Sequence, residues 1–168
     1  MDHANLKTLI VESSGLPVSV VREISDSRLL ALEHLELWLG SPAYGWDGAV
    51  DDLQPILSGK LFPKLSYLGL RDCEAADELA AVVANAPIAR RLRTLDLSLG
   101  NMGNDGFRAL GMLPRDGTLE KLDVHHHFAG AEMVNELKRL PFEVDASEVQ
   151  TPQDWGGGEQ HRYIAAAE

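Results

Sequence analysis

A short leucine pattern, L-x-x-L-x-L, recurs along this chain in a constant order. Five copies are clear and a sixth is weaker, with the anchors Leu6-Leu9-Val11, Leu32-Leu35-Leu37, Leu65-Leu68-Leu70, Leu92-Leu95-Leu97, Leu119-Leu122-Val124 and Phe142-Val144. The middle anchors are 26, 33, 27, 27 and 20 residues apart. One such unit cannot bury its apolar side alone, so the pattern predicts a stack of units that share a continuous core.

Each copy predicts a short strand followed by a helix. The strand positions alternate inward leucines with other residues, and the segments after them have helical periodicity. Residues 75–86 place Leu79, Val82 and Val83 on one helical face, and Pro87 ends the segment. We expect a second helix over residues 129–140, where Met133, Leu137 and Leu140 share a face.

The repeats resemble the ribonuclease-inhibitor-like class of leucine-rich repeats. Cys73 matches the ninth position of that class, and Met102, Gly106 and Leu110 match its later positions in the fourth copy. The remaining ninth positions differ from the Asn or Cys of the class, with Ser14, Gly40, Gly100 and His127. The resemblance implies an α/β solenoid, a right-handed horseshoe of about six repeats. A short parallel sheet is then expected on its concave face and helices on its convex face. We expect the repeat domain to span residues 1–150 and a capping tail to span 151–168.

The whole chain is similar to a group of bacterial leucine-rich-repeat proteins with no established activity. The segments that carry this resemblance are LEHLELWLGSPAYGW, LRTLDLSLGNMG, LEKLDVHHH and HRYIAAAE. Members of that group can be encoded near radical-SAM and ATP-grasp enzymes. The resemblance therefore implies a recognition or scaffold role.

Charge and composition exclude several partners. The formal net charge of -11 argues against nucleic acid and anionic lipid, which both require a basic surface. No apolar run reaches the roughly 18–20 residues of a membrane helix. Cys73 is the single cysteine, so internal disulfides are impossible and a cytoplasmic setting is expected. The repeat pattern begins almost at Met1, as in a piece of a longer protein, and the oligomeric state stays open.

The predicted concave face carries the candidate binding residues. Positions three, five and seven of each copy point away from the core, and their fifth-position column holds four carboxylates, which repel one another at strand spacing. Aromatic side chains next to these charges are typical of binding hot spots. We therefore predict a surface that binds a protein or basic peptide. Its residues are Glu36, Trp38, Tyr67, Arg71, Asp96, Asp123, His125, Glu143 and Asp145.

Two alternatives centre on His125. With Asp123 and Asp145 it could form a zinc site, and with Ser98 and Asp145 it could form a nucleophile–base–acid set. The sequence lacks a nucleophile elbow and evident oxyanion donors. We predict no enzyme, no cofactor and no metal. We expect His127 to be structural. A purely structural subunit is the third alternative.

The irregular segments have structural interpretations. Residues 41–52 are an insertion in which we expect Tyr44 and Trp46 to cover the edge of the core, in preference to forming a binding loop. The tail is expected to cap the stack, with a flexible WGGGEQ segment and a final strand over 162–166. We expect Cys73 to be buried and unreactive.

Overall fold

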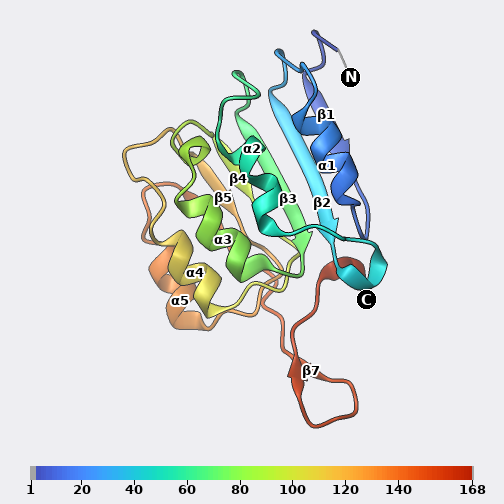
Figure 1. Cartoon of the computed structure of the whole chain (residues 1–168). Helices are drawn as coiled ribbons and strands as arrows, with labels where there is room; N and C mark the ends of the chain where they lie inside the picture. Colours follow the sequence, from blue (N-terminus) through green and yellow to red (C-terminus); the bar gives the residue numbers. More distant parts are fainter. Residues whose placement is uncertain (1–2, 168) are drawn as a thin grey trace.

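In the computed structural model, residues 3–167 form an α/β fold around one parallel sheet of six strands (Figure 1). Each strand pairs with the strands that precede and follow it in the sequence. The strands are β1 (Thr8–Val11), β2 (His34–Gly40), β3 (Tyr67–Cys73), β4 (Thr94–Asp96), β5 (Lys121–Asp123) and β6 (Glu143–Asp145). The predicted α/β class and parallel sheet are therefore confirmed.

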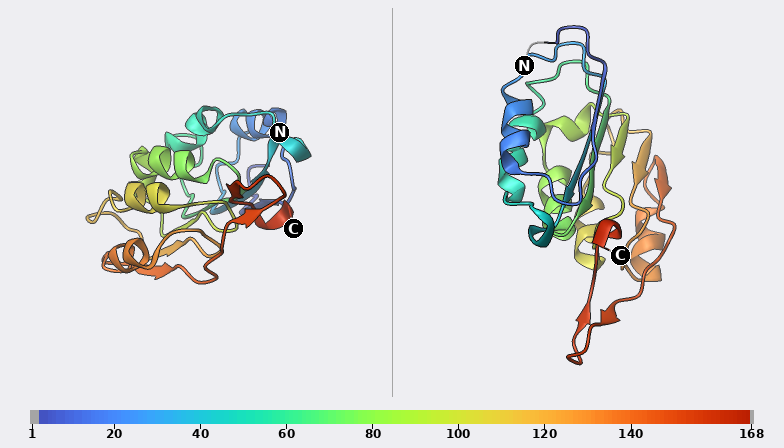
Figure 2. Two further views of the ribbon diagram at one scale, coloured as in Figure 1. Left: turned by 90° about the horizontal axis from the view of Figure 1, so that it is seen from below. Right: turned by 90° about the vertical axis from the view of Figure 1, so that its right-hand side faces the viewer.

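Short helices follow the strands. They are α1 (Val18–Ser25), α2 (Gln54–Leu57), α3 (Ala76–Ala84), α4 (Asn104–Leu110) and α5 (Ala131–Leu137), with the 3₁₀ turns η1 (Pro42–Tyr44), η2 (Val50–Leu53), η3 (Pro87–Arg90) and η4 (Ala165–Ala167). The array is curved, with the helices on its outer side and the strands on its inner side (Figure 2). Helix α3 ends at Ala84, two residues before the predicted end, and Ala86 before Pro87 adopts extended backbone.

The leucine anchors set the register of the sheet. Leu9 lies opposite Leu35, and the same middle anchor continues through Leu68, Leu95 and Leu122. The last four of these side chains have no exposed surface. The repeat spacing therefore predicted strand pairing correctly over the first five copies, including the 33-residue step, because the insertion lies between strands.

The predicted register of the sixth copy is wrong by two residues. Leu122 pairs with Val144 and not with Phe142, so Asp145 lies beside Asp123 and Glu143 lies beside Lys121. A shift of two residues keeps each side chain on the same face of a strand. The alternation of apolar residues therefore could not distinguish the two registers.

A column of residues with left-handed backbone lies at or just beyond the carboxyl ends of four strands. Asp72, Leu99, His126 and Glu148 have φ angles of 54°, 67°, 59° and 57°. Non-glycine residues rarely adopt this conformation. The last step of this column, from His126 to Glu148, equals the step from Leu122 to Val144, which supports the corrected register of β6.

The insertion closes the edge of the core. Trp46 is only 7% exposed, as expected for an aromatic side chain at the core edge, whereas Tyr44 is 55% exposed. Gly40 ends β2 with a φ of 77°, and a Cβ atom there would lie 1.8 Å from the Ser14 carbonyl oxygen. Glycine at this ninth position thus permits the close approach of two loops.

The tail lacks the final strand that was predicted over residues 162–166. The segment expected to be flexible forms the turn of a projecting hairpin, β7 (Gln153–Asp154) with β8 (Gln160–His161), in which Asp154 accepts the N–H groups of Gly156, Gly157 and Gly158 (Figure 1). Residues 162–166 form no strand.

The returning chain contacts the end of β3 and the loop after β4. The backbone N–H groups of Ala165 and Ala166 donate to the Leu99 carbonyl and the Asp72 carboxylate. Tyr163 and Ile164 are buried. The tail therefore covers the ends of the central strands. None of the helices described within residues 3–167 has the length and apolar character needed to cross a membrane.

Candidate functional site on the open sheet face

The predicted binding residues share the sheet face that lies opposite the helices. Side chains alternate along a strand, so burial of Leu35 and Leu37 against the helices turns Glu36 and Trp38 to the other face. The same alternation applies to the neighbouring strands. The structure divides the predicted residues into two groups with different electrostatics.

The first group is the Arg71 network, formed by Glu36, Trp38, Tyr67, Arg71 and Asp96. Arg71 donates from Nη1 to Glu36 Oε1 at 2.9 Å, and its Nε lies 3.4 Å from Asp96 Oδ2. Tyr67 donates its hydroxyl to Asp96 Oδ2 at 2.8 Å, with Glu36 Oε2 at 3.3 Å. Trp38 Nε1 donates to Glu36 Oε1 at 2.8 Å. Three strands are therefore joined by one set of charged hydrogen bonds.

This network corrects the expectation of an open carboxylate column. Glu36 is 7% exposed and Asp96 is 5% exposed. These two carboxylates are covered because the long Arg71 side chain extends from β3 to Glu36 on β2 and to Asp96 on β4. The Tyr67 ring fills the space between the two carboxylates. Glu36 and Asp96 are thus paired internally and are not free to bind a partner's cation.

The pKa of Glu36 reflects the same contacts. Burial by itself raises it, but the hydrogen bonds from Trp38 and Arg71, together with the Arg71 charge, outweigh burial and lower the pKa below its ordinary value. Burial and the adjacent Asp96 carboxylate raise the pKa of Tyr67. Glu36 therefore stays ionised and Tyr67 stays protonated.

Aromatic contacts fix the orientation of Trp38 and Tyr67 in the network. The Arg71 guanidinium carbon lies 4.9 Å from the centre of the Trp38 ring. The Tyr67 ring stacks on His34, with ring centres 3.8 Å apart and planes 7° from parallel. Trp38 and Tyr67 are consequently held in fixed orientations at the surface of the sheet.

The second group is the β5–β6 acidic cluster, which we define as Asp123, His125 and Asp145. Asp123 and Asp145 lie side by side on neighbouring strands. His125 Nδ1 lies 2.6 Å from Asp123 Oδ1, and each of these two side chains is at least 13% exposed. The Nζ atom of Lys121 lies 3.4 Å from Asp123 Oδ2.

Asp145 is oriented by the residue two positions after it. Ser147 donates from its hydroxyl at 2.7 Å and from its backbone N–H at 3.1 Å to Asp145 Oδ1. These bonds lower the pKa of Asp145. Glu143, which was predicted to belong to this column, is exposed and lies opposite Lys121.

The residues of the proposed catalytic set are not connected as a triad. Ser98 is fully buried, and its hydroxyl accepts a hydrogen bond from Arg71 Nε at 3.0 Å. His125 contacts Asp123, and Asp145 contacts Ser147. A buried hydroxyl that is held by a guanidinium has no base to activate it and no access to a substrate.

The other histidines and the cysteine have structural environments. His127 is fully buried; its Nδ1 accepts the Ala129 N–H, and its Nε2 lies 3.3 Å from the Ala146 carbonyl oxygen, as expected for a structural ninth-position residue. His126 is buried against Tyr163. Cys73 is buried, and burial raises the pKa of its thiol to about 12. These side chains are part of the core.

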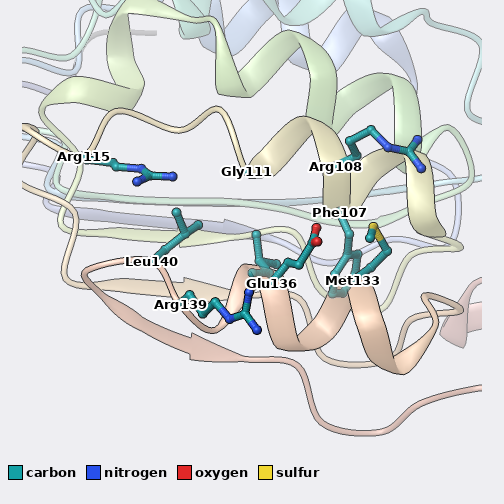
Figure 3. A pocket seen from close by; sticks show the side chains of 9 residues that line it. Phe107, Arg108, Gly111, Arg115, Met133, Glu136, Arg139 and Leu140 are labelled. Carbon is teal, nitrogen blue, oxygen red and sulfur yellow. The ribbon is translucent and has the colours of Figure 1, made fainter.

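A pocket of about 390 Å³ lies on the outer side, between α4 and α5 (Figure 3). Phe107, Leu137 and Leu140 contribute apolar surface. The Glu136 carboxylate points between the helices, while the Arg108 guanidinium points away from it and pairs with Asp105 (Figure 3). Because its charges are mixed and do not converge, this pocket offers no defined polar site.

Comparison with known proteins identifies a structural relative and no function. No protein-family model and no curated protein matches the chain. A crystal structure of a protein from Bacteroides fragilis is similar, with a TM-score of 0.87 and 30% sequence identity. The match covers 99% of this chain and 46% of that one, so this chain spans about half the length of that protein.

Proposed function

We propose that this chain is a leucine-rich-repeat solenoid that binds a protein or peptide on its open sheet face. Three observations support the repeat assignment: strands that pair in sequence order, leucine anchors in register, and left-handed corners at a matching period. The position of the helices on the outer side agrees with this architecture (Figure 2).

The observation that carries the binding role is the fixed arrangement of polar and aromatic side chains on the sheet face that lies opposite helices α1–α5 (Figure 2). Trp38 and Tyr67 are held by Glu36, Arg71 and Asp96 before any partner arrives. A preorganised surface loses little side-chain entropy on binding, so more of the contact energy becomes affinity. Aromatic side chains in such a setting are the usual anchors of an interface.

The charge of the face indicates the chemistry of the partner. The Arg71 network is internally paired, whereas Asp123 and Asp145 carry two carboxylates with one partly exposed lysine beside them. We propose that a lysine or arginine of the partner binds at these two carboxylates and that apolar residues contact Trp38. The net charge of -11 would accelerate the approach of a basic partner.

Selection from a random peptide library on the immobilised protein tests this role. We expect sequences enriched in Lys and Arg, and we expect Asp123→Lys with Asp145→Lys to lower the affinity of the selected peptides by about tenfold or more. Fluorescence anisotropy with a labelled selected peptide measures the change. The difference in affinity between the wild type and the double variant should be larger at low salt, where charges are less screened.

A matched variant separates the open face from the outer helices. Glu132→Lys with Glu136→Lys makes the same change of charge on α5, where both side chains are exposed. Peptide affinity should stay close to that of the wild type in this variant. If the α5 variant lost binding while the open-face variant retained it, the partner surface would be the outer side and the proposal would be wrong.

A further inference from the structure

The β5–β6 acidic cluster also has the composition and geometry of a metal site. Asp123, His125 and Asp145 each offer one ligand atom, and these atoms all lie within 4.8 Å of one another. Ligand atoms about 2.0–2.2 Å from a common ion lie roughly 3 Å apart. Small side-chain rotations would therefore bring one imidazole nitrogen and two carboxylate oxygens into a single coordination sphere.

The backbone already fixes the arrangement of these ligands. Asp123 and Asp145 are directly opposite on paired strands, and His125 follows Asp123 by two residues. Ser147 holds one oxygen of Asp145, as described above, which leaves the second oxygen for another ligand. Hydrogen bonds of this kind from neighbouring residues orient the ligands in metal sites.

The comparison with Asp96 shows what the cluster lacks. Asp96 belongs to the same column, but Arg71 and Tyr67 bind its carboxylate within a buried network. Among residues 3–167, the cations paired with Asp123 and Asp145 are Lys121, whose side chain is 37% exposed, and His125 when it is protonated. Two adjacent carboxylates with so little built-in positive charge would be stabilised by a bound cation.

We propose that Asp123, His125 and Asp145 bind a divalent first-row transition-metal ion such as Zn²⁺ or Mn²⁺. The imidazole favours such an ion over Mg²⁺ and Ca²⁺, which prefer oxygen ligands alone. Three protein ligands on an uncovered face leave coordination positions for water or a partner's side chain. Metal binding here does not require the proposed peptide binding, although both would use Asp123 and Asp145.

One consequence does rest on the proposed function. A bound ion and a partner's basic side chain would both require the carboxylates of Asp123 and Asp145. Saturation with the metal should therefore weaken the binding of a selected basic peptide. The ion would then act as a regulator of the same surface.

Calorimetric titration of the metal-free protein with Zn²⁺, and separately with Mn²⁺, tests the site without any partner. We expect one equivalent to bind in the wild type. His125→Ala and Asp145→Asn should each lower the affinity by about tenfold or more. Titration with Co²⁺ adds a spectroscopic readout, because visible absorption reports coordination by nitrogen and oxygen ligands.

The control is His161→Ala, which removes an imidazole from the projecting hairpin, where it stacks on Trp155. This variant should bind the metal as the wild type does. Circular dichroism checks the fold of each variant, and Asp123→Asn replaces any that does not fold. Metal binding that survives both His125→Ala and Asp145→Asn, or that His161→Ala abolishes, would overturn the assignment, as would a wild type that binds neither ion.

Discussion

Replacing Arg71 with methionine should lower the free energy of unfolding by about 3–5 kcal/mol, because it leaves Glu36 and Asp96 buried without their cation. Methionine keeps the apolar stem of the side chain, so the effect reports the lost charge and hydrogen bonds more than lost volume. Chemical denaturation at pH 7 measures it. The Trp38 fluorescence should also change, because the ring loses its contact with the guanidinium.

The stability difference between the wild type and Arg71→Met should depend on pH. In the wild type the pKa of Glu36 is depressed, so its contribution to stability is present above its ordinary pKa and is lost as the pH falls through the depressed value. Without Arg71, that pKa rises and the neutral carboxyl no longer requires a cation. The difference in stability between wild type and variant should therefore shrink as the pH falls through the ordinary glutamate pKa of 4.5 and below it.

Arg93→Met is the matched control. Arg93 pairs with Glu120 through side chains that are both more than 60% exposed, and exposed pairs contribute only about 0–1 kcal/mol. If Arg71→Met and Arg93→Met had equal effects, the Arg71 network would be an ordinary surface ion pair and would not define the open face.

The leucine anchors explain how far the sequence could predict this fold. Leu35, Leu68, Leu95 and Leu122 occupy the most buried positions of successive strands, and a recurring buried residue fixes both the face and the register of a strand. The sixth copy lacks a leucine anchor. Its shorter spacing and its Phe142-Val144 pair allowed two registers that bury the same face.

The left-handed corners and the path of the tail could not be predicted from the sequence. Asp72, Leu99, His126 and Glu148 share a left-handed backbone but no chemical property, so no residue type indicates the column. The returning tail is held by contacts to residues far away in the sequence, such as the ion pair of Arg162 with Asp77 on α3. Such contacts leave no periodic trace in a sequence.

The candidate site was predicted by position but not by electrostatics. The repeat pattern correctly predicted that Glu36, Arg71 and Asp96 share one face, but it carries no information on whether their side chains pair with one another. Whether a carboxylate is open depends on the reach of its neighbours, and Arg71 extends over two strands while Lys121 reaches one aspartate. Ser147, which holds Asp145, was not predicted, because it follows the strand and belongs to no column of the pattern.

Replacing Asp72 with asparagine should stabilise the protein by up to about 3 kcal/mol at neutral pH. Asp72 is fully buried; Oδ1 accepts the Ala166 N–H at 3.0 Å, and Oδ2 has no hydrogen-bond partner among residues 3–167. Burial outweighs this bond and the nearby His126 and Arg71 charges, and it raises the pKa to about 6. Asparagine retains an acceptor for Ala166, tolerates the left-handed φ of 54°, and carries no charge.

The direction in which stability changes with pH follows from proton uptake at Asp72. Between the ordinary aspartate pKa of about 4 and the raised value, the folded state binds more protons at Asp72 than the unfolded state does, so stability falls as the pH rises through this window. Asp72→Asn removes that slope. The variant and wild type should therefore have similar stability near pH 4 and diverge up to about pH 7, as measured by denaturant titration at each pH.

Asp116→Asn, at a side chain that is 78% exposed, controls for the loss of one negative charge and should keep the wild-type profile. A variant of Asp72 that was less stable than the wild type at pH 7 would show that the ionised carboxylate anchors the tail, because the bond to Ala166 would then outweigh the cost of burying the charge.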